Sequence, residues 1–510
     1  MTTRRYGWLA GSLFGAMALR TINQYWAGDF LEHAAVIREL ARHPWAPGHP
    51  LFAIQAPHPF FTPYTVGVAL IARAFQLHPV TVLSVMGMVN LAAFLVSFYL
   101  LTSTLLSRHA AFFGLIFTLL LWGRSPWQHS GFLHLNVMGF VLPYPSTFAM
   151  WMTLFILYAQ LRYNEAGASK WAVLVVIGAP IVLLSHPITA IVLAAGLVTF
   201  SLESALSQPG RLIRWGTVVA VASLVAAALW PFYPWFQLIA TGSETYAQPN
   251  LKMYEGVLPR VWPALLGVPL VVRRLRKQKF DRLSLFVIAL CLLYGLGAIL
   301  GNGPLGRVLA ALVLGLHLVL ADALADIESG LQLAVSRTTR LSLYAGAAVL
   351  AGVALLNATS ALVRAIPRGL LPRSIADDPR LERTLDLYRF VPRYVGEDDV
   401  VLADLNVGRY LPALAGKVVA FIDPEAFVPD HDTRRMAVHR FFLGDISTDE
   451  RRTLVDTYHA AWVVIDLKSN SLTAAVLTSI EQLGSVVHDD GRIRVFRLKQ
   501  TTAAPREERR

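Results

Sequence analysis

Cysteine and charged residues are scarce in this 510-residue sequence. Its single cysteine, Cys291, lies inside an apolar run. One thiol excludes a disulfide within the chain and a metal site built from several cysteines. Charged residues make up 15% of the chain, whereas a soluble domain normally has about 25%. With 55% hydrophobic residues and a mean hydropathy of +0.50, the composition predicts a polytopic α-helical membrane protein.

Several signatures of soluble proteins are also missing. No Gly-x-Gly-x-x-Gly segment follows a predicted strand, and no phosphate-binding Gly-x-x-x-x-Gly-Lys or zinc-binding His-Glu-x-x-His motif occurs. These absences count against an ATPase and a zinc protease. The formal net charge is +12, but no basic stretch in a soluble context is interleaved with aromatic residues, as nucleic-acid binding would favour. We therefore interpret Arg and Lys as markers of cytoplasmic loops and expect no nucleic-acid partner.

Long apolar runs dominate the chain before about residue 360. A helix needs roughly 20 apolar residues to cross about 30 Å of hydrocarbon. Twelve segments approach this length, although several are short: 6–22, 63–77, 80–106, 110–123, 145–161, 171–185, 187–202, 215–236, 261–272, 283–300, 305–324 and 341–358. Twelve full crossings would return the C-terminus to the cytoplasm. We expect about eleven, with 63–77 as the re-entrant segment.

Basic residues set the expected orientation, because Lys and Arg accumulate in cytoplasmic loops. Arg4 and Arg5 place the N-terminus in the cytoplasm. The segments that then face outside are 23–62, 124–144, 240–259 and 301–304, together with the region after 360. We expect a multi-pass protein of the inner (plasma) membrane with an extracytoplasmic C-terminal domain.

The outer loop 23–62 has a pattern of its own. Residues 29–43 have helical spacing, with Phe30, Ala34 and Ile37 on one face and charged residues elsewhere. This pattern predicts an amphipathic helix that lies in the membrane interface. Five prolines between positions 44 and 59 then favour an extended path.

Charge returns to an ordinary soluble density after about residue 360. Short apolar runs rich in β-branched residues predict strands at 400–403, 418–422, 461–466 and 493–498. Helices are expected between them, at 405–414, 431–442, 447–459 and 471–483. The predicted domains are therefore a multi-span region over 1–360 that carries the outer loop, a soluble α/β domain over 361–500 and a disordered tail over 501–510.

Asp29 is the candidate catalytic residue. It follows the first apolar segment, and a carboxylate at a membrane boundary can act as a general base or a ligand. The alternative is a helix N-cap, a position that favours Asp. Glu32 and His33 follow at i+3 and i+4, so all three can share one helix face. Such a trio suits a divalent cation or a proton-transfer group, unless it is only a solvated polar face.

Glu32 and His33 also belong to a wider set of candidate substrate-binding residues at predicted outer positions. Its other members are His58, His129, His186 and Arg307. A polar residue at membrane depth is costly and is a functional hypothesis by default, although an interfacial histidine often serves only as a hydrogen-bonded structural residue. Arg307 would hold a phosphate through charge-assisted hydrogen bonds, unless it merely snorkels to the interface.

Three parts of the sequence resemble the membrane glycosyltransferases of the C superfamily (GT-C). They are 28–33, 58–64 leading into the second apolar segment, and 142–145 with 184–190. The order of features is also similar to that family, which has a first span, a long outer loop with an acidic residue near its start, many further spans and often an outer C-terminal domain. The resemblance covers roughly residues 6–325.

This resemblance implies a hexosyl- or pentosyltransferase that uses a polyprenyl-phosphate-linked sugar. Transfer would occur on the outer face, with inversion, to an envelope glycan, a lipid or a protein. The resemblance gives Asp29 the role of deprotonating or orienting the acceptor hydroxyl, and Arg307 that of stabilising the leaving phosphate. Some relatives have a second acidic residue in a later outer loop, but 124–144 contains no Asp or Glu. We therefore assign no cofactor, and a divalent cation stays open as an alternative.

Two other functions remain as alternatives. A membrane transporter or lipid flippase would require polar residues near the bilayer midplane, discontinuous spans or repeated halves, and the sequence has no paired halves. A non-enzymatic assembly protein would use its outer domain to bind a partner, and Asp29 would then be only a cap.

Overall fold

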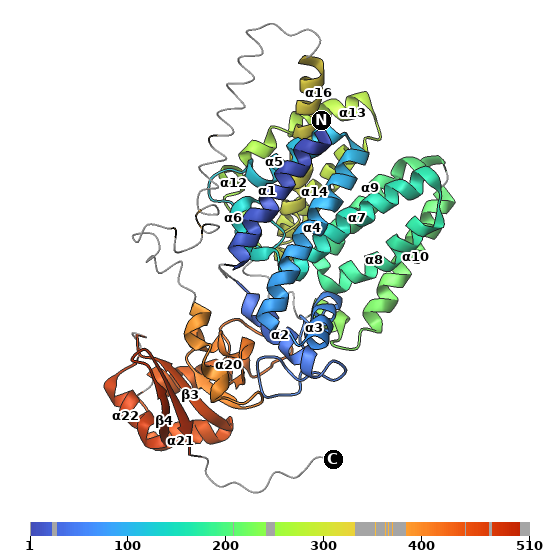
Figure 1. The fold of residues 1–510 in the computed structure, drawn as a ribbon. Helices are drawn as coiled ribbons and strands as arrows, with labels where there is room; N and C mark the ends of the chain where they lie inside the picture. The colour runs from blue at the N-terminus through green and yellow to red at the C-terminus, as the bar shows by residue number, and fades with distance from the viewer. Residues whose placement is uncertain are drawn as a thin grey trace. The chain divides into compact units, whose positions relative to one another are not determined.

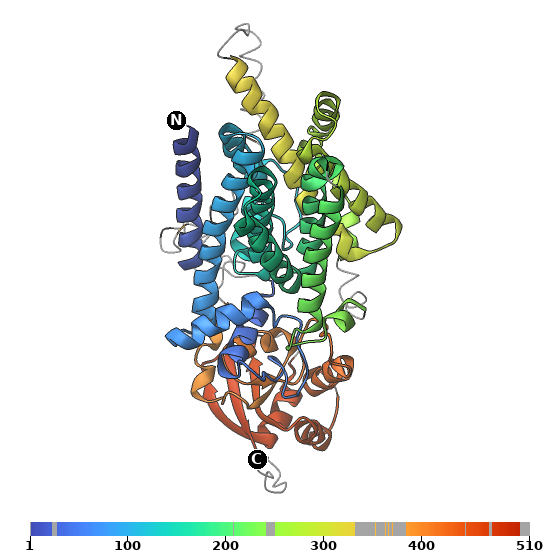
Figure 2. The same ribbon diagram turned by 90° about the vertical axis from the view of Figure 1, so that its right-hand side faces the viewer.

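The computed structural model describes most of the chain in two compact units. The described residues are 2–22, 28–207, 209–240, 250–331, 352, 363, 366, 370, 384–443, 445–468 and 472–499. The helical unit comprises Met1–Ala27, Thr62–Tyr64 and Leu83–Leu381, and the α/β unit comprises Gly28–Phe61, Thr65–Val82 and Glu382–Arg510. Figures 1 and 2 show the helices of the helical unit and the sheet of the α/β unit.

The apolar runs of the helical unit form helices, as their composition predicts. In chain order these are α1 (Thr2–Ile22), α4 (Pro79–Leu105), α5 (Arg108–Leu120), α6 (Leu135–Val141), α7 (Pro145–Ala166), α8 (Ser169–Ser185), α9 (Pro187–Ser207), α10 (Pro209–Ala228), η1 (Lys252–Tyr254), α12 (Val257–Leu265), α13 (Val268–Lys277), α14 (Arg282–Ile299), α15 (Gly303–Gly306) and α16 (Leu309–Leu331). Polar side chains cap three of them: Ser107 accepts the backbone N–H of Ala110, Asp281 that of Ser284, and Asn302 that of Leu305.

Several of these helices have the length and composition of membrane spans. Within the described residues, α4, α14 and the stretch Gly303–Glu328 each qualify, and α6 with α7 qualifies as a fourth if the pair is taken as one bent span. The axes of α6 and α7 differ by 107°. The turn between them contains Pro143, and Pro145 opens α7, which fits the tendency of proline to begin helices and not to continue them. Five shorter apolar helices accompany these spans.

The predicted span 261–272 is wrong as a single helix. It is divided between α12 and α13, with Leu266 and Gly267 at the break. A side chain at Gly267 would approach the backbone oxygen of Leu316 to 3.0 Å, so the break needs a glycine where α16 passes closely. The predicted span 341–358, apart from Gly352, the domain boundary at 360 and the tail 501–510 all lie outside the described residues.

The α/β unit is built around a five-stranded sheet with the order β2-β1-β3-β5-β4. Its strands are β1 (Val400–Ala403), β2 (Lys417–Val418), β3 (Ala460–Asp466), β4 (Gly484–Asp489) and β5 (Ile493–Leu498). β1 pairs parallel with β2 and β3, and β5 pairs antiparallel with β3 and β4. The four predicted strands are present, although β2 is shorter than expected. The sequence analysis missed β4, whose residues are mostly exposed or half-buried and lack a continuous apolar run.

Helices α20 (His431–Leu443), α21 (Thr448–Thr457) and α22 (Ala474–Leu483) cover one face of the sheet. The predicted helix 405–414 is instead two short turns, α19 (Leu405–Gly408) and η6 (Leu411–Ala413). These turns pack on the opposite face, together with the 3₁₀ turns η4 (Thr384–Tyr388) and η5 (Val391–Arg393). Alternate residues of β1 point to opposite faces: Val401 and Ala403 join one core cluster, Val400 and Leu402 the other.

The second face of the sheet is completed by a segment from the other end of the chain. Helix α2 (Phe30–Arg42) and the loop after it contribute Ala35, Leu51 and Phe52 to the core formed by Val401, Val418 and their neighbours. The backbone oxygen of Leu51 accepts the N–H of Val418 at 2.8 Å. Helix α3 (Pro63–Phe75) follows this loop. The helix predicted at 29–43 is therefore confirmed, but it is buried on almost every side.

Candidate functional site

Asp29 stands at the start of α2 and is exposed. It occupies the N-cap position, but its side chain makes no capping hydrogen bond. The backbone oxygen of Asp29 accepts the N–H of His33 at 2.9 Å and so begins the helix. Capping by the side chain therefore does not account for an aspartate here.

Glu32 and His33 are buried one turn further along, with 8% and 4% of their surface exposed. The sequence interpretation of this trio as a solvated polar face therefore does not hold for them. His33 stacks on Phe60, with ring centroids 4.4 Å apart. Burial, followed by the neighbouring His58, lowers the pKa of His33 to about 3, so it is neutral at physiological pH.

His58 links the first loop to the C-terminal segment of the same unit. Its Nε2 lies 3.1 Å from Glu425 Oε2 and 3.5 Å from Glu32 Oε1. The side chain is fully buried, and its ring packs edge-on against Phe60. A single imidazole nitrogen therefore stands between one carboxyl group from α2 and another from the segment before α20.

The Glu32 carboxyl group lies in a strongly acidic neighbourhood. Burial raises the pKa of Glu32 well above its usual value, and the negative charges of Glu425, Asp29 and Asp423 raise it further, against an opposing effect of Arg409. Desolvation and like charges both favour the neutral acid. Both effects shift Glu32 toward its protonated form, which is a poorer ligand for a cation than the carboxylate.

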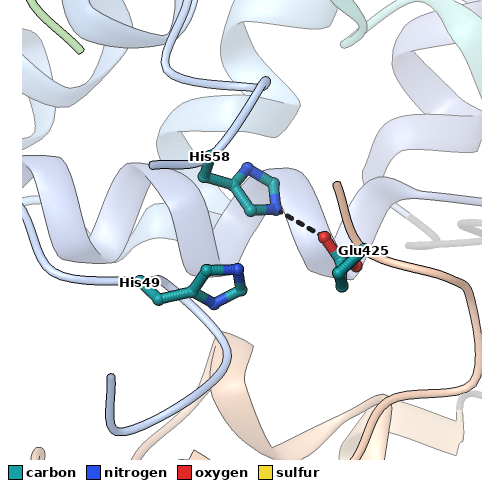
Figure 3. Close-up of side chains that lie close together, drawn as sticks. All are labelled: His49, His58 and Glu425. Carbon is teal, nitrogen blue, oxygen red and sulfur yellow. Dashed lines mark hydrogen bonds and ion pairs between the residues drawn. The ribbon is translucent and has the colours of Figure 1, made fainter. Parts of the chain in front are cut away.

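His49, His58 and Glu425 form a second cluster, the His–Glu cluster, whose nitrogen and oxygen atoms all lie within 4.8 Å of one another (Figure 3). All three side chains are buried. By composition and spacing this set resembles the two-histidine, one-carboxylate sites of divalent metals. A metal, however, requires an unprotonated nitrogen facing it.

The hydrogen bonds of the two histidines argue against a metal. His49 Nδ1 accepts the backbone N–H groups of Leu51 and Phe52 at 3.2 and 3.3 Å, and His58 Nδ1 accepts that of Phe60 at 3.2 Å. A neutral imidazole has one acceptor nitrogen and one N–H, so these bonds assign the hydrogen of each ring to Nε2. Those are the two nitrogens that face Glu425 in Figure 3. The Nε2–H of His58 donates to Glu425 Oε2 at 3.1 Å, whereas His49 Nε2 makes no hydrogen bond among the described residues. The cluster does not fit a divalent cation.

The far end of α2 is fixed by a buried ion pair. Lys417 Nζ lies 2.6 Å from Glu39 Oε2 and also donates to the backbone oxygen of His49 at 2.8 Å. Burial alone would raise the pKa of Glu39, but Lys417 and hydrogen bonds, including one from the Gly48 N–H, bring it below its usual value. Arg38 donates to the backbone oxygen of Gly416 at 2.7 Å. Charged residues of α2 thus serve as internal ties.

The remaining predicted site residues belong to the helical unit. Arg307 donates to the backbone oxygen of Ser130 at 2.8 Å and also contacts the Ser130 hydroxyl. Burial, Arg307 and Arg260 lower the pKa of the adjacent His129, so the structure brings His129 and Arg307 together. His186 Nδ1 accepts the N–H of Thr189 at 3.2 Å, a contact at the start of α9 that suits a structural role.

Asp423, Glu425 and Arg409 were not among the predicted site residues. Asp423 and Glu425 come from a turn after a predicted strand, and Arg409 lies within the predicted helix 405–414. Their only sequence signal is the pair of acids in Asp423–Pro424–Glu425, which follows the predicted strand 418–422. Nothing in the sequence reveals that this turn meets α2, more than 380 positions earlier.

Comparison of the sequence with protein-family models and with curated proteins finds no relative.

Comparison with solved structures does find similar folds. An oligosaccharyltransferase from Archaeoglobus fulgidus, tethered to an acceptor peptide with the NVT sequon, matches with a TM-score of 0.50 and 13% identity over 97% of this chain and 74% of that chain. The archaeal oligosaccharyltransferase AglB from the same organism, in complex with an inhibitory peptide and a dolichol-phosphate, matches with a TM-score of 0.49 and 12% identity. The match covers 97% of this chain and 74% of that chain. The mycobacterial arabinofuranosyltransferase AftD matches with a TM-score of 0.47 and 12% identity, over 94% of this chain and 40% of that chain. The first of these similarities shows that the chain shares the overall fold of that oligosaccharyltransferase.

Proposed function

We propose that the protein is a membrane glycosyltransferase that transfers a sugar from a polyprenyl-phosphate donor to a glycan, lipid or protein acceptor. The observation that carries this proposal is the exposed Asp29 carboxylate at the start of α2, beside the buried acidic group of Glu32. The similarity in fold to an oligosaccharyltransferase supports it, because the chain combines apolar helices of spanning length with a separate α/β unit that contains Asp29. A lipid-linked donor needs both environments.

In the proposed reaction Asp29 is the general base. The acceptor hydroxyl oxygen attacks the anomeric carbon, and its proton passes to the Asp29 carboxylate. The bond between the anomeric carbon and the phosphate oxygen breaks, and its electron pair leaves with the lipid phosphate. Attack from the side opposite the leaving group inverts the anomeric carbon. The raised pKa of Glu32 favours placing the negative charge on Asp29 and not on Glu32.

Other predicted residues have supporting roles in this proposal. Arg307 would stabilise the charge that develops on the leaving phosphate, a contribution that is large in a site shielded from water. His129, near Arg307, would contribute to the substrate-binding surface, whereas the buried His33 and His58, and His186 at the start of α9, have structural roles. The protein would act from the plasma membrane, with the α/β unit on the extracytoplasmic side and membrane lipid around the helical unit.

The test compares wild type with Asp29→Asn in membranes with matched expression. Labelled sugar is supplied as its polyprenyl-phosphate adduct, and transfer is followed over time. Because general-base catalysis contributes about 10²–10⁴-fold, we expect the variant to lose at least a hundredfold in rate. The matched control is Asp398→Asn, an exposed aspartate of the same unit, which should transfer at the wild-type rate.

Two results would count against the proposal. Equal transfer by wild type and Asp29→Asn would remove Asp29 from the chemistry. Absence of transfer by wild type with several donors would favour the transporter or assembly alternatives.

A further inference from the structure

The His–Glu cluster has a geometric relation to Asp29 that the proposed reaction does not yet use. Glu425 contacts His58 at 3.1 Å, and His58 lies 3.5 Å from Glu32. Glu32 is in the first turn of α2, three residues after Asp29. The contacts therefore form a continuous path from the C-terminal domain to the turn that presents Asp29.

This path is rigid for identifiable reasons. His58 is held on one side by the Phe60 N–H at Nδ1, and on the other by Glu425 at Nε2. With one nitrogen accepting and the other donating, its tautomer and ring orientation are both determined. His33, next to Glu32, is fixed by its stack on Phe60. Only Asp29 in this group is exposed and available to a substrate.

We infer that Glu425 is a positioning residue for Asp29, acting through the Nε2–H of His58 on the first turn of α2. The C-terminal domain thereby contributes to the site of the first loop without contacting substrate. The inference rests on the proposed function, since it takes Asp29 as the reacting carboxylate. It also assigns the His–Glu cluster to hydrogen bonding and not to a metal.

The position of Asp29 at the start of α2 explains why contacts that hold the first turn matter. Asp29 lies at the end of its helix, where the backbone has the fewest hydrogen bonds to hold it. A displacement of about 1 Å in a reacting group can reduce a rate by about a hundredfold. Residues that hold the first turn therefore affect the rate even though they lie beneath the reacting group.

The experiment compares Glu425→Ala and Glu425→Gln with wild type in transfer assays, at equal amounts of folded protein. The alanine removes the acceptor of the His58 N–H, and we expect kcat to fall tenfold or more while KM for the lipid-linked donor stays within about twofold. Glutamine keeps an oxygen that accepts this N–H, so kcat should recover to within about threefold of wild type. The control is Asp398→Asn. Asp398 pairs with Arg42, the last residue of α2, at 3.1 Å, so this change weakens a contact at the end of the helix opposite Asp29.

A measurement without activity separates this inference from the proposed function. Hydrogen exchange of the amides in residues 30–36 should quicken in Glu425→Ala but not in Asp398→Asn. If exchange quickens while wild type transfers no sugar, the proposed function fails and the structural tie stands. Unchanged exchange and unchanged kcat in Glu425→Ala would overturn the inference.

The metal content of the purified protein tests whether the His–Glu cluster is a hydrogen-bonded group or a metal site. Purified wild type, incubated with Zn²⁺ and then dialysed, should retain no stoichiometric zinc by elemental analysis, and chelator treatment should leave transfer intact. One retained zinc per chain that is lost equally in Glu425→Gln and Glu425→Ala would identify a metal centre and overturn the hydrogen-bonding assignment.

Discussion

At the scale of single residues, the environment of each carboxyl group decides what it can do. Asp29 and Glu32 are three positions apart, yet one is exposed and the other buried. Desolvation and like charges raise the pKa of Glu32, while Asp29 keeps access to solvent. Two similar side chains in one helical turn are thus suited to different tasks.

The raised pKa of Glu32 predicts a pH-dependent effect of Glu32→Gln. The folded-state pKa of Glu32 is raised, so the stability linked to its proton is fully present below the unfolded value of about 4.3 and is lost as pH rises above it. Glutamine resembles the neutral acid and has no such loss. We expect the variant to be more stable than wild type at pH 7, with a difference that shrinks toward pH 4.

Thermal unfolding of the purified protein, measured between pH 4 and pH 8, tests this expectation. A Glu32→Gln variant that is less stable than wild type at pH 7 would mean that Glu32 is ionised in the folded state.

At the scale of secondary-structure elements, α2 packs within the α/β unit. Its amphipathic pattern correctly predicts a helix, but the same pattern suits a membrane interface and a protein core equally well. The ion pair of Glu39 with Lys417 and the hydrogen bond from Arg38 to Gly416 use the charged face. On an isolated helix these charged side chains would be hydrated. Here they bond to groups in β2 and directly before it.

This arrangement predicts a large effect of Lys417→Met. The change leaves Glu39 buried without its ammonium partner, and breaking a buried pair by removing one partner costs about 3–5 kcal/mol. We expect the α/β unit to unfold at lower denaturant concentration. The double variant Glu39→Met with Lys417→Met should recover part of the loss, because no buried charge is left unpaired.

Chemical denaturation followed by tryptophan fluorescence measures both variants, since Trp462 lies in the core of this unit. Equal stability of Lys417→Met and wild type would contradict the structural role of the pair.

At the scale of the whole molecule, the two compact units do not follow the order of the chain. The α/β unit combines residues 28–61 and 65–82 with the region after 382. Hydropathy correctly separates apolar helices from a charged C-terminal region, but it assigns the first loop to the membrane region by sequence position. Core contacts of Ala35, Leu51 and Phe52 assign it to the other unit.

Removal of the C-terminal region tests this organisation. In a chain that ends at residue 381, the loop 28–61 loses the sheet face on which it packs, and we expect trypsin to cleave after Arg38 and Arg42 in membranes where full-length protein resists. The helices of the helical unit should stay protected. The cleavage sites are identified by mass spectrometry, and an unchanged pattern would show that α2 is stable without the sheet.

The sequence by itself determined the membrane class, most helices, four of five strands and the candidate Asp29, because these depend on local composition and periodicity. It resolved neither the break between α12 and α13 nor the exposed strand β4, where local patterns are weak. Only the tertiary structure decided that Glu425 and His58 meet Glu32, and that Glu39 pairs with Lys417. Such contacts join positions hundreds of residues apart, and no local pattern encodes which distant side chain will neutralise or desolvate a given group.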